Sequence, residues 1–175
     1  MKKKDKNGRR KLDLVDCLLE NPAQGMSKIA ETTGMHRRTV WQIQKDLEKD
    51  HTIWGYTTVI NEQKLNQVVY LLQFKTKPFT KAFADLITQR LMSSEPAKQG
   101  VRILDVYYMN GDYDVFIKFS APDHETARAY FEILRSVYKD HFLDIPRVSY
   151  VNLPLVQAGK LNPELKQKIY TLVPK

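Results

Sequence analysis

Residues 26–45 read MSKIAETTGMHRRTVWQIQK, and their spacing is typical of two short helices joined by a tight turn. Ala30 lies four residues before Gly34, Val40 follows six residues later, and Ile43 three after that. A small residue at Ala30 lets a second helix cross closely, and Gly34 can take the positive φ that ends the first helix. Val40, Ile43 and Leu47 then recur at helical spacing, as the buried side of the second helix. The stretch therefore predicts a helix-turn-helix.

The other face of the predicted second helix is basic, because no acidic residue occurs between Thr32 and Lys45. A face of cations and amides can lie among phosphates and read the edges of bases. The predicted DNA-binding residues are Lys28, His36, Arg37, Arg38, Thr39, Trp41, Gln42 and Lys45. The alternative is a plain helical hairpin whose charged face is only solvated.

A basic segment, residues 1–11, precedes this region. It holds seven cationic side chains against one carboxylate, Asp5; the cations are Lys2, Lys3, Lys4, Lys6, Arg9, Arg10 and Lys11. A flexible basic arm suits phosphate contact or insertion into the minor groove. A disordered, solubilising tail or a tag remnant explains the same charge run equally well.

The composition is that of an ordinary globular protein, with 175 residues, 42% hydrophobic and 27% charged residues, and a net charge of +8. That length allows one medium domain or two small ones. No apolar run approaches the roughly 20 residues of a membrane span, and the lysine-rich start lacks the apolar stretch of a signal peptide. We therefore expect a cytoplasmic protein without a membrane partner.

The single cysteine, Cys17, excludes an internal disulfide and lies in an apolar segment, which indicates a buried thiol.

Periodicity places a first helix before the quoted stretch and an extended segment after it. Apolar residues at helical spacing mark that helix, which Asn21-Pro22 ends: Leu12, Val15, Leu18 and Leu19. Residues 12–54 thus form a three-helix head. Aromatic and β-branched residues at 53–60 favour a strand in the linker, residues 55–66.

The pattern changes after Asn66 to an order of β-α-β-β-α-β. Strands are expected at 68–76, 101–109, 113–120 and 147–153, with helices at 80–92 and after the capping residue Asp123. This order is typical of a ferredoxin-like sandwich, assigned to residues 67–154, and the tail at 155–175 has a weak helical signal at 163–170. The expected fold class is α+β: an N-terminal three-helix (winged) helix-turn-helix head joined to a C-terminal ferredoxin-like sandwich.

The second face of that sandwich is expected to be apolar. Val115, Ile117 and Phe119 alternate toward one face, while Phe116 points to the other. Helices cover only one face of such a sheet, so an apolar second face predicts association between sheets of two subunits. Phe116 and Tyr108 are the residues that distinguish association from ordinary core packing.

Three pieces of sequence, taken in order, resemble the Lrp/AsnC (feast/famine) family of transcriptional regulators. They are AETTGMHRRTVWQIQKDLEKD at 30–50, the run Ile53-Trp54-Gly55-Tyr56, and Asn110-Gly111-Asp112-Tyr113-Asp114, which looks like the family's G-x-Y-D loop. The resemblance implies a homodimer formed through the C-terminal sheets, or a tetramer or octamer. It also implies a small-molecule effector, commonly an amino acid, bound between subunits near the glycine loop.

The chain departs from that family at three places. His36 stands where a serine commonly begins the recognition helix, His51-Thr52 replaces a glycine and a β-branched apolar residue, and Asn66 replaces a usual glycine. These departures bear on base preference and linker geometry, and leave the expected fold unchanged.

The loop at 110–114 also has a purely structural interpretation, because Asn-Gly is a favoured type I′ hairpin turn. The effector hypothesis assigns Asn110, Gly111, Asp112, Tyr113 and Asp114 to ligand binding. Glycine would let backbone N–H groups approach a ligand carboxylate, and Asp112 or Asp114 could receive an ammonium.

Catalytic and metal-binding patterns are absent from the sequence. The histidines are spread out, at His36, His51, His124 and His141, and none has a convincing metal-ligand spacing. No phosphate-cradling glycine loop or nucleophile-base set is visible, so we expect neither an enzyme nor a cofactor.

The sequence therefore predicts a homo-oligomeric regulator that binds double-stranded DNA and responds to a small molecule. Two alternatives remain: an architectural, largely nonspecific DNA-compacting protein, and a ligand-binding module whose head does not bind DNA. Salt dependence and specificity ratio distinguish the regulator from the architectural protein. Any tight DNA binding excludes the ligand-binding module.

Overall fold

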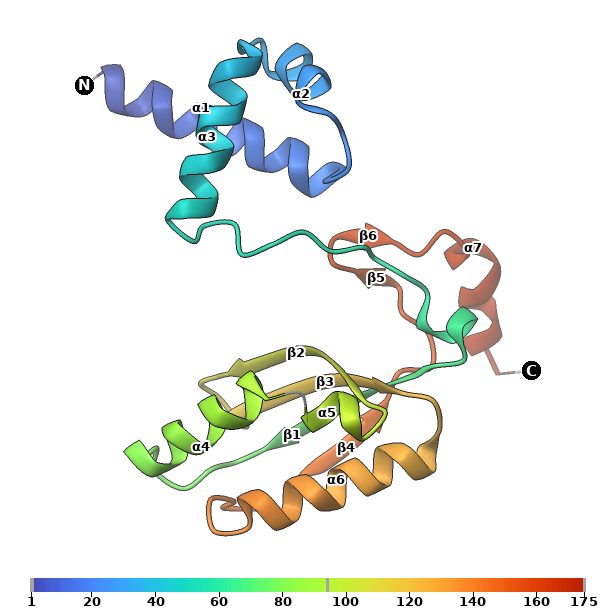
Figure 1. Cartoon of the computed structure of the whole chain (residues 1–175). Helices are drawn as coiled ribbons and strands as arrows, with labels where there is room; N and C mark the ends of the chain where they lie inside the picture. The colour runs from blue at the N-terminus through green and yellow to red at the C-terminus, as the bar shows by residue number, and fades with distance from the viewer. Residues whose placement is uncertain (1, 94, 175) are drawn as a thin grey trace. The chain divides into compact units, whose positions relative to one another are not determined.

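The computed structural model describes residues 2–93 and 95–174, with side chains from residue 7 onward. The chain divides into two compact units, which we call the head and the body (Figure 1). The head contains the N-terminal residues up to Val59 together with Val156–Leu161. The body contains Ile60–Leu155 and the residues that follow Leu161. Each unit has its own hydrophobic core.

The head is built on three helices, α1 (Lys2–Glu20), α2 (Met26–Thr33) and α3 (Arg37–Lys49). Gly34 ends α2 with φ 65° and ψ 20°, the left-handed conformation that the sequence predicts for it. The buried side chains that join the three helices are Leu14, Cys17, Leu18, Ile29, Val40, Ile43 and Leu47. The predicted helix-turn-helix and the buried cysteine are therefore confirmed.

The basic N-terminal segment is helical rather than a flexible arm, which corrects the expectation for residues 1–11 over the part described. Helix α1 begins at Lys2 and runs without a break into the apolar residues that pack on α2 and α3. Lysine and arginine are good helix formers, so a helix anchored by Leu14 and Leu18 extends readily through them. Lys11 lies 3.6 Å from Asp50 and joins this helix to the end of α3.

The linker contains no strand within residues 52–61, so the expected strand there is wrong. Those residues have no neighbouring strand to complete a ladder, and β propensity alone does not form one. A short 3₁₀ helix, η1 (Glu62–Leu65), follows instead, and Asn61 caps it by accepting the N–H of Lys64.

No strand follows α3 among the described residues up to Val59. The segment directly after α3 therefore does not form the wing of a winged helix-turn-helix. The hairpin in this unit, β5 (Val156–Gln157) and β6 (Lys160–Leu161), comes from the tail. Its turn residues Ala158 and Gly159 have φ of 45° and 75°, which matches a type I′ turn. The Lys160 amino group donates to the carbonyl of Glu20 at the end of α1.

The body is an antiparallel sheet in the order β2-β3-β1-β4, with helices on one face (Figure 1). Its elements are β1 (Val68–Phe74), α4 (Lys81–Met92), α5 (Glu95–Lys98), β2 (Arg102–Tyr108), β3 (Val115–Ala121), α6 (His124–Tyr138) and β4 (Arg147–Tyr150). Thr80 and Asp123 cap α4 and α6 through side-chain oxygens. The ferredoxin-like order is confirmed, with the short α5 inside the segment expected to be a loop.

One face of the sheet packs on the helices and the other is left open. Alternate residues such as Leu72, Ile117 and Phe119 are buried against residues of α4 and α6. The strand partners place the remaining residues on the open face: Val69, Leu71, Gln73, Asp105, Tyr107, Phe116, Lys118, Arg147 and Ser149. This surface is mixed rather than purely apolar, with Lys118 3.6 Å from Asp105.

Tyr108 lies on the helix-covered face and not beside Phe116, which corrects its expected role. It pairs with Val115 and its ring meets Phe79 edge-on at 5.1 Å. The register shifts between Ile103 and Asp105, and this bulge reverses the alternation of the rest of β2. Tyr107 takes the open-face position, with its ring centroid 6.0 Å from that of Phe116.

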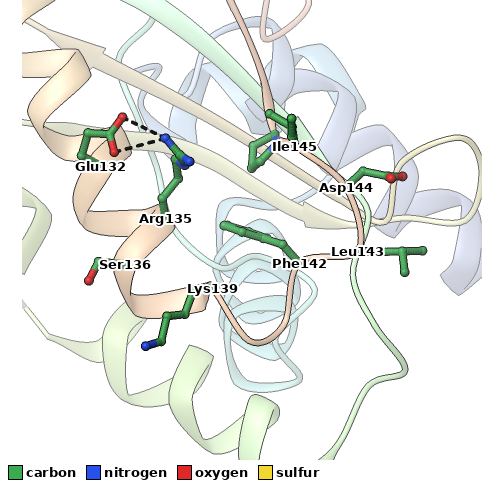
Figure 2. Close-up of a pocket in the computed structure, with 9 residues that line it drawn as sticks. Glu132, Arg135, Ser136, Lys139, Phe142, Leu143, Asp144 and Ile145 are labelled. Atoms are coloured by element: carbon green, nitrogen blue, oxygen red, sulfur yellow. Dashed lines mark hydrogen bonds and ion pairs between the residues drawn. The ribbon is translucent and has the colours of Figure 1, made fainter.

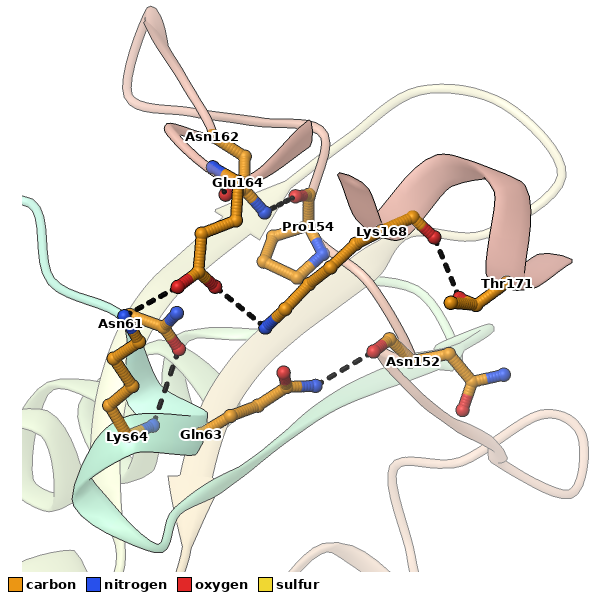
Figure 3. Close-up of polar contacts among 9 residues, drawn as sticks. All are labelled: Asn61, Gln63, Lys64, Asn152, Pro154, Asn162, Glu164, Lys168 and Thr171. Carbon is orange, nitrogen blue, oxygen red and sulfur yellow. Dashed lines mark hydrogen bonds and ion pairs between the residues drawn. The ribbon is translucent and has the colours of Figure 1, made fainter. Parts of the chain in front are cut away.

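The tail ends in α7 (Leu165–Lys168) and the 3₁₀ helix η2 (Ile169–Leu172), close to the weak helical signal at 163–170. Figure 3 shows how Glu164 lies between two lysines, 2.6 Å from Lys64 and 2.8 Å from Lys168. Those contacts lower the pKa of Glu164 to about 2, chiefly through hydrogen bonds from Lys168 and Lys64. Gln63 also donates to the carbonyl of Asn152, so η1 contacts the segment that follows β4 as well as the tail.

Candidate nucleic-acid interface and loop site

The outer face of α3 carries the side chains predicted to meet DNA. Val40, Ile43 and Leu47 are buried, so helical geometry turns the other side of α3 to solvent. The predicted residues on that side are all exposed: Arg37, Arg38, Trp41, Gln42 and Lys45. Lys28 on α2 and His36 just before α3 are exposed as well, while Thr39 is half-buried.

The N-terminal turn of α3 lacks the capping and acidic side chains that usually stabilise the start of a helix. His36 precedes the helix in an extended conformation without a side-chain cap, and the first turn holds no acidic residue. Arg37 and Arg38 occupy that turn instead, where the helix dipole disfavours a cation by about 0.3–1 kcal/mol. An anion at this end would relieve the conflict, because the first backbone N–H groups of a helix lack partners within it and the two arginines add positive charge to the same turn.

Three of the predicted DNA-binding side chains are engaged with acidic neighbours. The pairs are Lys28 with Glu31 at 2.9 Å, Gln42 with Asp46 at 2.9 Å, and Lys45 with Glu48 at 2.7 Å. The hydrogen bond to Glu48 raises the pKa of Lys45. Exposed ion pairs contribute little to stability because solvent screens them, so phosphate can compete for the lysines. Within the described residues, Arg37 and Arg38 have no such ion pair.

Tyr56 joins the segment after α3 to the back of that helix. Its hydroxyl accepts from Gln44 Nε2 at 2.7 Å and donates to Glu48 Oε1 at 3.0 Å. Hydrogen bonds from Lys45, Gln44 and Tyr56 lower the pKa of Glu48. Sequence reasoning missed this contact, although an exposed aromatic residue soon after a predicted recognition helix was the signal that could have found it.

The loop at 110–114 is not a two-residue type I′ turn. Tyr108 and Val115 are the last paired residues of the strands, and Met109 N–H donates to the Asp114 carbonyl at 2.7 Å. Gly111 has φ 153°, but Asn110 does not have the positive φ that a type I′ turn needs at both central residues. The connection is therefore wider, and Gly111 is its one residue with positive φ.

Asp114 braces this loop from inside. Its Oδ2 accepts the backbone N–H of Thr76 at 2.8 Å, and Lys75 lies 3.7 Å from its Oδ1. The Thr76 hydrogen bond is the main cause of the lowered pKa of Asp114. Lys75 also donates to the Gly111 carbonyl at 2.7 Å.

The five predicted effector residues therefore lie together but do different things. Asn110, Gly111 and Asp112 are exposed, and the Tyr113 ring lies 5.9 Å from the Arg147 guanidinium. Since Asp114 is engaged, Asp112 is the carboxylate available to an incoming ammonium.

A separate open cleft of about 600 Å³ lies between α6 and the segment before β4 (Figure 2). Its lining combines the paired Glu132 and Arg135 with Lys139 and the exposed Leu143 and Ile145. None of the predicted site residues lines it. Among the described residues, no His, Cys, Asp and Glu side chains gather as a metal site, and no helix is long and apolar enough to span a bilayer.

Head and body together define a class of architecture: a helix-turn-helix unit joined to a ferredoxin-like sandwich, the fold of Lrp/AsnC-type regulators. No protein-family profile matches the chain. The AsnC family transcriptional regulator from Agrobacterium tumefaciens superposes with a TM-score of 0.63 and 17% identity, over 91% of this chain and 97% of that one. Transcriptional regulator NMB0573 from Neisseria meningitidis, in complex with L-Met, gives a TM-score of 0.63 and 14% identity, over 90% and 97%.

A curated relative points the same way. The chain is 19% identical over 127 residues to the HTH-type transcriptional regulator FL11 of Pyrococcus abyssi (strain GE5 / Orsay), covering 71% of this chain and 77% of the relative. The resemblance to Lrp/AsnC regulators expected from the sequence is thus confirmed in the fold.

Proposed function

We propose that the protein is a sequence-specific transcriptional regulator of the Lrp/AsnC type that binds double-stranded DNA through α3. The observation that carries this proposal is the first turn of α3, which holds two exposed arginines and no acidic residue at the positive end of the helix. A cation at that position is unfavourable for the isolated helix and favourable beside a phosphate or a guanine edge. Catalysis forms no part of the proposal, and a cytoplasmic location remains part of it.

The direct test is selection of genomic fragments bound by the full chain, followed by footprinting of the fragments recovered. We expect a preferred site, bound about 10³-fold or more tightly than random DNA at the same salt concentration. The architectural alternative predicts similar affinity for every fragment. A protein with no measurable affinity for duplex DNA would contradict both and leave the ligand-binding module.

The proposed assembly is a homodimer formed through the open face of the sheet, with tetramers or octamers built from it. Leu71, Tyr107 and Phe116 supply apolar area to that face, and Lys118 and Asp105 supply charge that a second copy can complement. A dimer would present two heads to successive major grooves, about 34 Å apart on one side of the duplex. A footprint with two half-sites, abolished together with the dimer, is the expected outcome.

The proposed effector is an amino acid bound at a subunit boundary beside residues 110–114. Support comes from the glycine in this loop, from the exposed side chain of Asp112, and from the relative whose structure holds L-Met. Calorimetry against the common amino acids at millimolar concentration tests it, with DNA affinity expected to change about 5- to 150-fold. Gly111→Val should abolish that change and leave ligand-free DNA binding intact. Absence of heat with every amino acid would reduce the loop to a connection between strands.

A further inference from the structure

We propose that Trp41 reads the methyl group of a thymine in the major groove, an inference that rests on the proposed DNA binding by α3. Trp41 is 46% exposed on the outer face of that helix. It lies four residues after Arg37 and three after Arg38, so the indole is the immediate neighbour of both on the helix surface.

Several polar side chains near Trp41 are already hydrogen-bonded within the protein, which leaves Trp41 well placed to contact a base directly. Gln42 Nε2 is held by Asp46 at 2.9 Å, Lys45 by Glu48 at 2.7 Å, and Gln44 faces Tyr56 at 2.7 Å. Among the described residues, none of Arg37, Arg38 and Trp41 has a side-chain partner of this kind. The surface offered to a groove is therefore two guanidiniums flanking an aromatic ring.

The arginines and the tryptophan suit different base edges in the major groove. Guanine presents two acceptors to the major groove and suits arginine, whereas the thymine methyl is the one apolar group that any base presents there. An indole has no acceptor and its single donor leaves most of its surface apolar, so thymine is the base edge that it can desolvate favourably. We infer a site in which G·C pairs adjoin a thymine whose methyl group contacts Trp41.

A lone exposed apolar side chain is common on protein surfaces and by itself means little. Trp54, which is 94% exposed in the segment after α3, serves as the matched control. The difference is position, because Trp41 stands on a basic helix face and Trp54 lies outside any helix or strand.

The first experiment replaces each thymine of the selected site by deoxyuridine, which removes the methyl and keeps every hydrogen-bonding group. For the wild-type chain we expect about fourfold weaker binding at one thymine per half-site, the contribution of one buried methyl group. Trp41→Ala should bind more weakly and show no further loss on that substitution. Trp54→Ala should retain the wild-type sensitivity, and thermal melts of both variants establish that the head is folded.

The second experiment uses the fact that the chain has two tryptophans. In Trp54→Phe the remaining indole is Trp41, and we expect saturating DNA to shift its emission and protect it from iodide quenching. In Trp41→Phe the remaining Trp54 should stay accessible.

The outcomes separate this inference from the proposed function. A preferred site that tolerates every deoxyuridine, or a Trp41→Ala variant as methyl-sensitive as the wild type, overturns the role of Trp41 and leaves sequence-specific binding intact. Unchanged quenching of Trp41 in the DNA complex does the same. If no preferred site is recovered, the proposed function fails and the thymine contact fails with it.

Discussion

Tyr56 Oη donates a hydrogen bond to Glu48 Oε1 across 3.0 Å, and so ties the segment that follows α3 back to that helix. The same carboxylate pairs with Lys45, which belongs to the proposed DNA-binding face. Glu48 therefore connects the linker with the proposed DNA-binding face of the helix. A substitution at Tyr56 should therefore first change the hydrogen bonding and the pKa of Glu48.

Tyr56→Phe should raise the pKa of Glu48 toward its ordinary value. Lys45, Gln44 and Tyr56 all donate hydrogen bonds that lower this pKa, and the variant removes the last of them. Titration of the Glu48 carboxyl by NMR measures the effect. Tyr107→Phe removes a phenol that donates to Asp105 and should leave Glu48 unchanged. An identical Glu48 titration in Tyr56→Phe would show that the bond does not persist in solution.

Leu14→Ala should destabilise the head by about 2–5 kcal/mol, because Leu14 is fully buried among the three helices. Leu12→Ala, at a position 64% exposed on the same helix, should change stability by less than about 0.5 kcal/mol. Urea unfolding followed by tryptophan fluorescence reports on the head, since Trp41 and Trp54 both belong to it. Equal midpoints for the two variants would contradict the packing described.

The contact of Glu164 with Lys64 and Lys168 should make the body sensitive to acid. The folded-state pKa is about 2, below the ordinary value of 4.5, so folding is favoured by the ionised form. This stabilisation is complete above the unfolded pKa and is lost as the pH falls from about 4.5 through 2. Glu164→Gln should therefore be less stable than wild type at pH 7, with the difference vanishing near pH 2. Thermal melts across that range measure it, and a difference that grows in acid would reverse the sign and refute the assignment.

Phe116→Lys should dissociate the proposed dimer without unfolding the body. Phe116 lies on the open face, where a second positive charge next to Lys118 would repel a partner sheet. Sedimentation of the full chain should change from dimer to monomer, with circular dichroism unchanged. Leu143→Lys, at an exposed position in the cleft beside α6, is the control expected to remain dimeric. A Phe116→Lys dimer as stable as wild type would move the interface elsewhere.

Arg9→Ala with Arg10→Ala should flatten the salt dependence of DNA binding. Both arginines are exposed on α1, and removing one arginine–phosphate interaction lowers the log-log slope by about 0.9. Binding titrations at several salt concentrations measure the slope for one duplex. Arg135→Ala, on α6 of the body, should leave it unchanged. If the double variant keeps the wild-type slope, the basic turn of α1 does not touch phosphate.

Periodicity and capping are enough to predict most of the fold. The head helices, the order of strands in the body and the cap at Asp123 follow from local patterns whose physical causes operate within a few residues. The two positions at which the Lrp/AsnC family commonly has glycine and this chain does not also have a local explanation. His51 and Asn66 stand where the resemblance implies glycine, and both adopt positive φ, 59° and 54°. Asparagine and histidine are among the residues that enter this region most readily.

What could not be predicted depends on tertiary context. The bulge before Asp105 reverses which β2 residues meet the helices, and no periodicity marks it, so the sequence pattern places Tyr108 rather than Tyr107 on the open face. The pairing of Asp114 with Thr76 uses residues 38 positions apart, so from sequence this brace looks like a candidate ligand. The residues on α3 are predictable as a face, but the acidic partners of Gln42 and Lys45 require knowledge of rotamers.

The head is assembled from two stretches of chain, since Val156–Leu161 groups with the residues that end at Val59. Transplanting the head onto another protein would therefore take two segments rather than one. A fragment that stops at Val59 leaves the Ala158-Gly159 turn behind, together with the lysine that reaches the end of α1. Circular permutation that brings Leu161 next to the N-terminus would turn the discontinuous head into a single transferable piece.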